Sequence, residues 1–274
     1  PQVGFNPYSK KSGVNMKIAT LNCNGFRACV RKGFRDWLET AAPDVLCLQE
    51  VRFAQDGLTG VHAPGDDWHW VQVDAEKKGY SSVAIWSRVE PIAVHRSIGL
   101  DWADREGRAV GMEFENAVIW SIYFPSGTSG DERQAMKDDF LAFMTPKMQA
   151  WSALDKAVLI CGDVNIAHTE LDIFHHKANA KKSGFLPRER QWMTDRLAEG
   201  WRDSLRDVRA GEEIYSWWSS RSKTAREKNV GWRIDYQLAS TNWGQTTAAR
   251  VDKDPQISDH APLVVEYEMT LVGA

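Results

Sequence analysis

The sequence predicts an α/β protein in which two strand-rich layers pack face to face and helices cover the outside. Two observations support this fold class. Short apolar runs of strand length recur along almost the whole chain and outnumber the helical segments. The helical segments cluster in three places, where they can lie outside the strand layers.

Nine apolar runs are predicted to be strands. The run within WHWVQV alternates apolar and polar residues, as a half-buried strand does. The runs within KIATLNC, DVLCLQE and AVLICGD are more continuously apolar, which is typical of central strands covered on both faces. The predicted strands are Lys17–Cys23, Val45–Gln49, His69–Val73, Ser82–Trp86, Ala109–Phe114, Val118–Tyr123, Ala157–Cys161, Ile234–Ala239 and Leu263–Tyr267.

Three segments carry apolar residues at helical spacing. Gly25–Ala42 is predicted to be one helix that Pro43 ends. Asp131–Leu154 has the same rhythm over a greater length, and Arg188–Ala198 is a third, shorter helix.

The chain reads as one domain over residues 16–270, because it has no internal repeat, low-complexity tract or linker. Residues 1–15 lack an apolar stretch and precede the first strand, so we interpret them as an extension outside the fold. No apolar run approaches the roughly 20 residues that cross a bilayer, which excludes an integral membrane protein. We expect a monomer, because no exposed apolar repeat is evident.

The net charge of −3 excludes a uniformly basic surface but leaves room for local basic segments. Residues 177–190 and 221–233 are two such segments, and each taken alone indicates a solvated loop. Aromatic residues and asparagines lie among their cations, which favours a nucleic-acid surface. The four cysteines form no C-x-x-C element, and three sit in or beside apolar runs, so we predict a reduced, cytosolic protein without a zinc site.

Polar residues recur where the apolar runs end. Any one of them indicates a turn, because Asp and Asn commonly follow strands. Glu50 is a poor turn former, however, and Asp235 lies inside an apolar run, where a buried carboxylate requires a partner. Six such clusters favour a shared site over independent turns. Their members are Asn22, Glu50, Tyr123, Asp163 with Asn165, Asp235, and Asp259 with His260.

Seven motifs in order give the chain a specific resemblance. They span nearly all of residues 16–270: LNCNG at 21–25, CLQE at 47–50, IYFPSG at 122–127, GDVN at 162–165, KKSGFLPRERQW at 181–192, GWRIDY at 231–236 and SDH at 258–260. The chain resembles a bacterial member of the exonuclease III family of apurinic/apyrimidinic endonucleases, within the endonuclease/exonuclease/phosphatase superfamily. The resemblance implies a DNase I-like, four-layer α/β sandwich of two packed mixed sheets flanked by helices.

The resemblance also implies the activity. It is Mg²⁺-dependent hydrolysis of the phosphodiester 5′ to abasic sites in duplex DNA, in base excision repair, with Mn²⁺ as a possible substitute. Activity on blocked 3′ ends (3′-phosphodiesterase and 3′-phosphatase) and 3′→5′ exonuclease activity accompany it. The implied location is the bacterial cytoplasm, at the nucleoid.

Roles for single residues follow from the same resemblance. Glu50 and Asp163 would bind the metal ion, and Asp259 and Asn22 would complete or support its surroundings. Asp163 would also orient or deprotonate the attacking water. The remaining catalytic residues would be Asn165 on the phosphate, His260 as a donor to a phosphate oxygen, and Asp235 on the other ring nitrogen of that histidine. Tyr123 would add a hydrogen bond or, as a phenolate, a charge near the scissile group.

DNA-binding roles are implied for seven further residues. Trp217, Trp218 and Trp232 would form a pocket for a base-less sugar, although packing in the core explains each of them equally well. Contacts with the DNA backbone would come from Asn179, Lys181, Lys182 and Arg188.

The sequence departs from the family pattern at three places. Arg52 stands where many relatives have Lys, Ser126 follows Pro125 where close relatives often have Asn, and Asn24 replaces an acidic residue. These departures concern the details of ion coordination and the balance among the activities.

Two alternatives to this function stay open. Lipid phosphodiesterases and inositol phosphatases share the metal-binding elements, but they do not need the basic stretch at 181–192 or the tryptophans. A DNA-binding protein without catalysis could discard Glu50, Asp163 or His260, all of which are present.

Overall fold

A computed structural model describes residues 15–274. Its strands form two six-stranded sheets, in the orders β11-β12-β1-β2-β4-β3 and β5-β6-β7-β8-β10-β9. The strands are β1 (Met16–Asn22), β2 (Val45–Gln49), β3 (His69–Val73), β4 (Val83–Ser87), β5 (Ala93–His95), β6 (Ala109–Glu113), β7 (Ala117–Tyr123), β8 (Ala157–Asp163), β9 (Arg202–Asp203), β10 (Asp235–Ala239), β11 (Gln245–Val251) and β12 (Leu263–Glu268).

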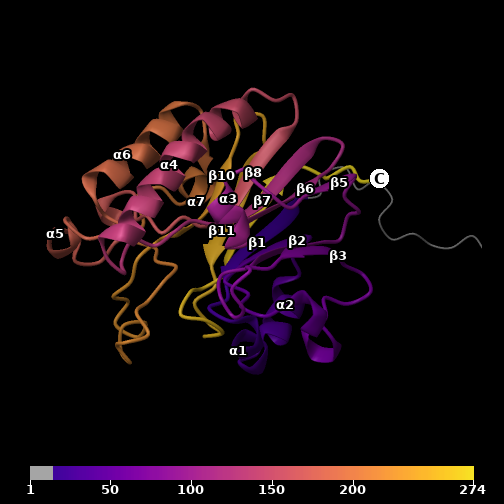
Figure 1. The fold of residues 1–274 in the computed structure, drawn as a ribbon, viewed down its shortest axis with the longest axis horizontal. Coiled ribbons are helices and arrows are strands. Elements are labelled where there is room, and N and C mark those ends of the chain that lie inside the picture. The colour runs from indigo at the N-terminus through magenta and orange to yellow at the C-terminus, as the bar shows by residue number, and fades with distance from the viewer. Residues whose placement is uncertain (1–14) are drawn as a thin grey trace, which may run out of the picture.

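The helices lie outside the sheet pair, except that Ser204–Val208 packs against β10 and β11 and places Leu205 in the core between the sheets (Figure 1). They are α1 (Phe26–Arg31), α2 (Phe34–Ala41), α3 (Asp101–Arg105), α4 (Asp131–Ser152), α5 (His176–Asn179), α6 (Pro187–Ala198) and α7 (Ser204–Val208), with short 3₁₀ turns at Gln55–Gly57, Gly60–His62 and Glu170–Asp172. No helix among residues 15–274 is long and apolar enough to cross a membrane. The extension predicted over residues 1–15 lies outside the described residues except for Asn15.

Three apolar cores separate four layers. Alternate residues of each strand point to opposite faces, so Ile18 faces the other sheet while Ala19 faces the helices. The central core joins the two sheets, a second joins one sheet to α1 and α2, and a third joins the other sheet to α4 and α6. Each sheet is mixed, because β1 and β2 are parallel, as are β7 and β8, whereas the other neighbours are antiparallel. The predicted four-layer α/β sandwich is confirmed.

Some predicted elements differ from the structure. The single helix expected over Gly25–Ala42 is wrong: it is two helices, separated at Lys32 and Gly33, and Gly33 has a φ of 96° that a continuous helix does not allow. Strands β5, β9 and β11 carry too few buried residues, or are too short, to give an apolar run. All nine predicted strands are present, with ends shifted by at most two residues.

The topology brings the ends of several strands together on one side of the sandwich, which we call the strand edge. β1, β2, β7 and β8 all end there, and antiparallel β10 begins there, with Asp235 paired to Asp163 and Tyr123 paired to Asp163 on its other side. Residues far apart in sequence thus become neighbours by register alone.

Gly162 is required for the close approach of β7 and β8 beside this edge. A Cβ at Gly162 would lie 1.9 Å from the carbonyl oxygen of Ile122, and its φ is +150°. We expect Gly162→Ala to lower the free energy of unfolding by about 3 kcal/mol, which is roughly a 10 °C fall in melting temperature. Scanning calorimetry of the variant and the wild type measures both quantities.

Gly79→Ala is the matched control, because Gly79 has a positive φ but no neighbouring atom within 4 Å of the added Cβ. It should show only the smaller cost of backbone strain, about 1 kcal/mol. Equal losses in the two variants would mean that the contact with Ile122 does not matter.

Candidate active site

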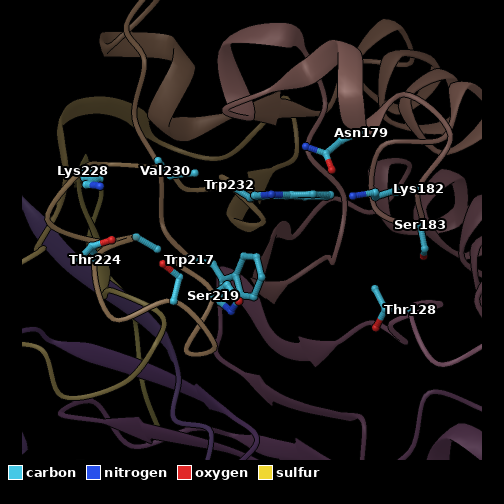
Figure 2. A pocket seen from close by; sticks show the side chains of 12 residues that line it. Thr128, Asn179, Lys182, Ser183, Trp217, Ser219, Thr224, Lys228, Val230 and Trp232 are labelled. Atoms are coloured by element: carbon cyan, nitrogen blue, oxygen red, sulfur yellow. The ribbon is translucent and has the colours of Figure 1, made fainter.

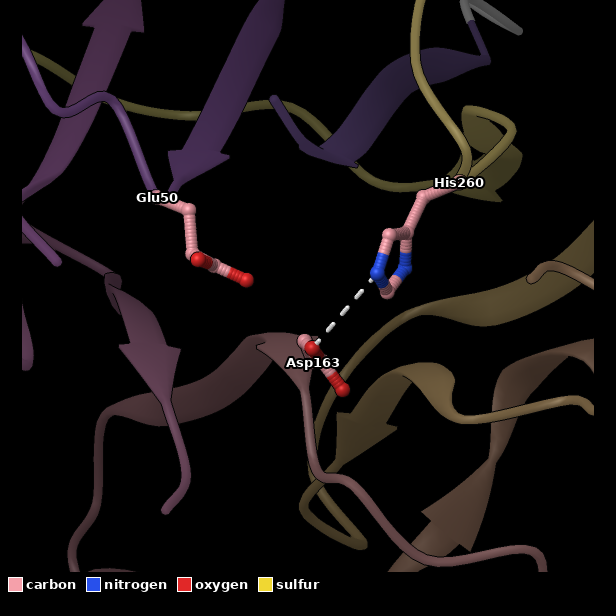
Figure 3. Close-up of side chains that lie close together, drawn as sticks. All are labelled: Glu50, Asp163 and His260. Carbon is pink, nitrogen blue, oxygen red and sulfur yellow. Dashed lines mark ion pairs between the residues drawn. The ribbon is translucent and has the colours of Figure 1, made fainter. Parts of the chain in front are cut away.

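Three ionisable side chains converge at the strand edge. Glu50, Asp163 and His260 each offer a ligand atom, and these atoms lie within 4.8 Å of one another (Figure 3). Asn22, from the end of β1, bridges the two carboxylates: its Nδ2 donates to Oε1 of Glu50 at 2.8 Å and to Oδ2 of Asp163 at 2.9 Å. Arg52 contacts the second oxygen of Glu50. Two acids at such short range repel each other, so the site favours a cation between them.

The buried carboxylates fit a divalent ion. Asp163 is 2% exposed. Its burial, opposed by His260 and assisted by the charges of Asp235 and Glu50, raises the pKa of Asp163 to about 7. A cation would remove this penalty, and oxygen ligands are those that hard divalent ions prefer. Such an ion, when bound, polarises a phosphate oxygen and lowers the pKa of a bound water.

Asp235 orients the imidazole ring of His260. Its Nδ1 lies 2.9 Å from Oδ2 of Asp235, which also accepts a hydrogen bond from Oγ of Ser216 at 2.6 Å. Burial opposes the charged imidazole, but the charge and hydrogen bond of Asp235, with help from Asp163 and Asp259, raise the pKa of His260 to about 10. The imidazolium therefore presents Nε2 as a donor, 3.9 Å from Oδ2 of Asp163. This geometry supplies the partner that a buried Asp235 requires.

Tyr123 lines the cleft that also contains Glu50, Asp163 and His260, and its ring packs against a buried arginine. The guanidinium carbon of Arg108 lies 4.7 Å from the centre of the Tyr123 ring, and Nη1 of Arg108 donates to the Tyr123 carbonyl at 3.0 Å. Burial, followed by the charges of Glu50 and Asp163, raises the pKa of the Tyr123 phenol well above its ordinary value. Without a bound cation, the phenol of Tyr123 therefore favours its neutral form, which can donate a hydrogen bond.

Asn165 and Asp259 flank the three central side chains. Asn165 follows β8 in a left-handed conformation with a φ of 57°, and its backbone N–H donates to Oδ1 of Asp163 at 2.9 Å. Asp259 accepts hydrogen bonds from Nδ2 of Asn24 at 3.0 Å and from Nε1 of Trp217 at 3.2 Å. Both line the cleft, whose volume is about 550 Å³, but Asp259 is not one of the three converging ligands.

A second hollow, of about 470 Å³, adjoins the catalytic cleft. We call it the tryptophan hollow, because Trp217 and Trp232 line both spaces, with ring centres 6.2 Å apart and planes at 88°. Figure 2 shows the Trp232 ring edge-on, with Asn179 and Lys182 on one side and Lys228 on the other. The hollow therefore presents aromatic rings and lysine side chains directly beside the catalytic cleft.

Trp218 lies elsewhere. It is 2% exposed, packs with Tyr215, Ala225 and Ala261, and has the guanidinium of Arg226 over its ring at 4.5 Å. Of the two interpretations that the sequence left open for Trp218, the structure places it in a core.

The four predicted DNA-backbone residues occupy different positions. Asn179 and Lys182 line the tryptophan hollow. Lys181 is exposed just before Lys182. Arg188 is 56% exposed and makes a two-pronged contact with Asp138, with Nη2 and Oδ2 2.9 Å apart. Arg188 is therefore partly neutralised, whereas both lysines remain on the outer surface of the 181–186 loop.

Sequence reasoning missed several residues of the site. Ser216 orients Asp235, Arg108 supports Tyr123, and Arg221 lines the catalytic cleft. Arg221 lies in the basic segment 221–233, so composition gave a signal for it. Ser216 and Arg108 had none, because their roles depend on neighbours far along the chain.

Hydrolysis of a phosphodiester requires neutralisation of charge on the phosphate oxygens, an activated water and a donor near the leaving group. The converging acids, the imidazolium and the neutral phenol meet these needs at one edge of a two-sheet sandwich, and this places the protein among the hydrolytic nucleases. More particularly, the chain belongs to the Endonuclease/Exonuclease/phosphatase family, whose sequence profile matches residues 19–260.

Individual relatives agree with this assignment. An exodeoxyribonuclease from Bacillus subtilis is 38% identical over 255 residues, which cover 90% of this chain and 98% of that protein. A DNA repair nuclease, APEX1, from Danio rerio is 35% identical over 264 residues, covering 92% and 82%. The solved structure of an AP endonuclease from Archaeoglobus fulgidus superposes with a TM-score of 0.83 at 26% identity, covering 93% of this chain and 100% of that one.

Proposed function

We propose that this protein hydrolyses the phosphodiester 5′ to abasic sites in duplex DNA during base excision repair. The same site would act on blocked 3′ ends and remove nucleotides 3′→5′. The observation that carries the proposal is the direct contact between two spaces: Trp217 and Trp232 line both the catalytic cleft and the tryptophan hollow. A phosphate beside the acids would have its sugar at the tryptophans.

The catalytic roles follow from the hydrogen bonds in the cleft. Glu50 and Asp163 would hold Mg²⁺, with Mn²⁺ as a substitute, and Asn22 and Asp259 would fix the surroundings. Asp163 would also orient the attacking water and accept its proton. Three further residues would contact the phosphate: Asn165, His260 through Nε2, and Tyr123 through its hydroxyl.

Selectivity for damage would come from the hollow. An extruded nucleotide loses less stacking energy when its base is missing, so an abasic sugar would enter the aromatic hollow at the lowest cost. Asn179, Lys181, Lys182 and Arg188 would contact phosphates on either side, which gives salt-dependent affinity without sequence preference. Trp218, buried behind the hollow, would support its wall and would not touch DNA.

The relatives support the same activities. They include an exodeoxyribonuclease, a DNA repair nuclease and an AP endonuclease. A monomer in the bacterial cytoplasm, brought to the nucleoid by its substrate, remains our expectation from the sequence.

Cleavage of four duplexes and one lipid tests the proposal. We expect Mg²⁺-dependent incision of an abasic duplex, slower release of phosphate or nucleotides from 3′-phosphate and recessed 3′ ends, and no incision of an intact closed duplex. EDTA should abolish every activity, and Mg²⁺ should restore it, because Glu50 and Asp163 need a cation between them.

A phosphoinositide is the matched negative substrate, since it offers a phosphate without a DNA backbone. Hydrolysis of the lipid with no incision of abasic DNA would assign the scaffold to lipid chemistry. Binding of abasic DNA without cleavage in Mg²⁺ would leave a DNA-binding protein. Full activity in EDTA would remove the cation from the mechanism.

A further inference from the structure

A buried ion pair lies behind the catalytic cleft and has no place in the chemistry above. Nζ of Lys137, on α4, is 2.7 Å from Oε1 of Glu189, on α6, and both side chains are 0% exposed. A buried ion pair gives little net stability compared with apolar side chains of the same size, because both charges lose their hydration. The two charged groups are therefore best explained by the backbone groups of neighbouring loops to which each is hydrogen-bonded.

Lys137 holds the loop after β8, residues 164–168, which we call the catalytic loop. Its Nζ donates to the carbonyl oxygen of Asn165 at 2.8 Å. Asn165 makes two further hydrogen bonds: its backbone N–H donates to Asp163, and its Nδ2 donates to the carbonyl oxygen of Phe124 at 3.0 Å. Lys137 thus fixes from behind a residue that faces the cleft.

Glu189 holds the loop that forms the edge of the tryptophan hollow. Its Oε2 accepts hydrogen bonds from the N–H groups of Gly184 at 2.7 Å and Leu186 at 3.0 Å. Gln134, on α4, donates to Oε1 at 3.2 Å. One carboxylate therefore satisfies two backbone donors of the 181–186 loop and the ammonium that binds the catalytic loop.

The two loops meet at Gly184 without spare room. A Cβ at Gly184 would lie 2.9 Å from the Trp232 ring and 3.1 Å from the carbonyl oxygen of Asn165. Ser183, the preceding residue, lines both the catalytic cleft and the hollow. A small movement of either loop therefore changes the distance between Asn165 and the hollow.

We propose that Lys137 and Glu189 are a positioning pair that sets the separation between the phosphate-binding Asn165 and the sugar-binding wall formed by Ser183 and Trp232. This inference rests on the proposed function. Cleavage at an abasic site needs phosphate and sugar seated together, whereas removal of nucleotides from a 3′ end depends mainly on the catalytic cleft. The pair thus determines specificity without touching substrate.

Three variants test the pair. Glu189→Leu removes both loop contacts, and Lys137→Met releases Asn165, whereas Glu189→Gln keeps an oxygen that can accept from Gly184 and Leu186. We expect Glu189→Leu and Lys137→Met to lower the ratio of abasic incision to 3′-end removal by at least about tenfold, since misplacement of about 1 Å is costly. Glu189→Gln should fall between them and the wild type. The loss should appear in kcat, with the Kd for abasic DNA within about threefold.

Met148→Ala is the control, because Met148 is fully buried on the same helix and touches neither loop's hydrogen bonds. It should lower the melting temperature and leave the ratio unchanged. Hydrogen exchange at the amides of Gly184 and Leu186 should accelerate in Glu189→Leu and stay slow in Met148→Ala. A ratio that is unchanged in Glu189→Leu and Lys137→Met, or lowered equally in Met148→Ala, overturns the inference.

Failure of the proposed function has a different signature. If the wild type leaves abasic DNA intact, the proposed function is refuted before any variant is made. The hydrogen-exchange rates then test the contact between Glu189 and the loop by themselves. If the amides of Gly184 and Leu186 stay protected in Glu189→Leu, Glu189 does not hold the loop.

Discussion

Replacing Asp163 by asparagine is expected to lower turnover on abasic DNA by at least about a hundredfold, because general-base or water-orienting groups contribute that much or more. Both carboxylate oxygens accept hydrogen bonds, from Nδ2 of Asn22 at 2.9 Å and from the N–H of Asn165 at 2.9 Å. Asparagine offers one oxygen and one NH₂ group, so it loses the charge, the proton acceptor and one of these contacts.

Binding should survive this substitution, because the residues proposed to contact the DNA backbone lie in the 179–188 segment. Single-turnover rates and a binding titration, both in Mg²⁺, separate the two quantities. Asp195→Asn is the matched control, since Asp195 lies on α6 with Gln191 as its hydrogen-bond partner at 2.7 Å. Turnover of Asp163→Asn within threefold of the control would remove Asp163 from the chemistry.

Asp235→Asn is expected to lower turnover by up to about ten-thousandfold, by analogy with the loss of the aspartate from an Asp-His couple. The carboxylate of Asp235 is 1% exposed and makes its shortest contacts with Ser216 and Nδ1 of His260. An amide cannot stabilise the imidazolium by charge, and its NH₂ group can oppose the N–H of the ring. Nε2 of His260 then no longer serves as a fixed donor.

Ser216→Ala distinguishes charge from hydrogen bonding. It removes the 2.6 Å hydrogen bond to Oδ2 of Asp235 and the acceptor of the N–H groups of Ile234 and Asp235, both at 3.1 Å, but leaves the carboxylate in place. We expect turnover to fall by less than about tenfold, because only one of these hydrogen bonds, worth about 1 kcal/mol, reaches the carboxylate. Steady-state kinetics on abasic DNA compares the two variants. Losses of equal size would show that the charge of Asp235 is not what supports His260.

Much of the fold was predictable because buried strands must be apolar. Each of the nine predicted strands, from Met16–Asn22 to Leu263–Glu268, lies in one of the two sheets. The missed strand β11 has only two buried residues, Thr246 and Ala249, since it lies at a sheet edge. Gly33 broke the first predicted helix because its φ of 96° is a backbone property that apolar spacing does not reveal.

The order of residues along the chain specifies the apolar strands, the polar residues at their ends and, through the motifs, the family. The tertiary structure alone decided which of these residues meet. Asn22 and Asp163 are 141 residues apart and share a hydrogen bond, and Lys137 on α4 donates directly to the carbonyl oxygen of Asn165, a contact that no local pattern encodes. The reason is physical: burial is written residue by residue in the chain, whereas strand pairing and helix packing fix distances between segments only when the whole core closes.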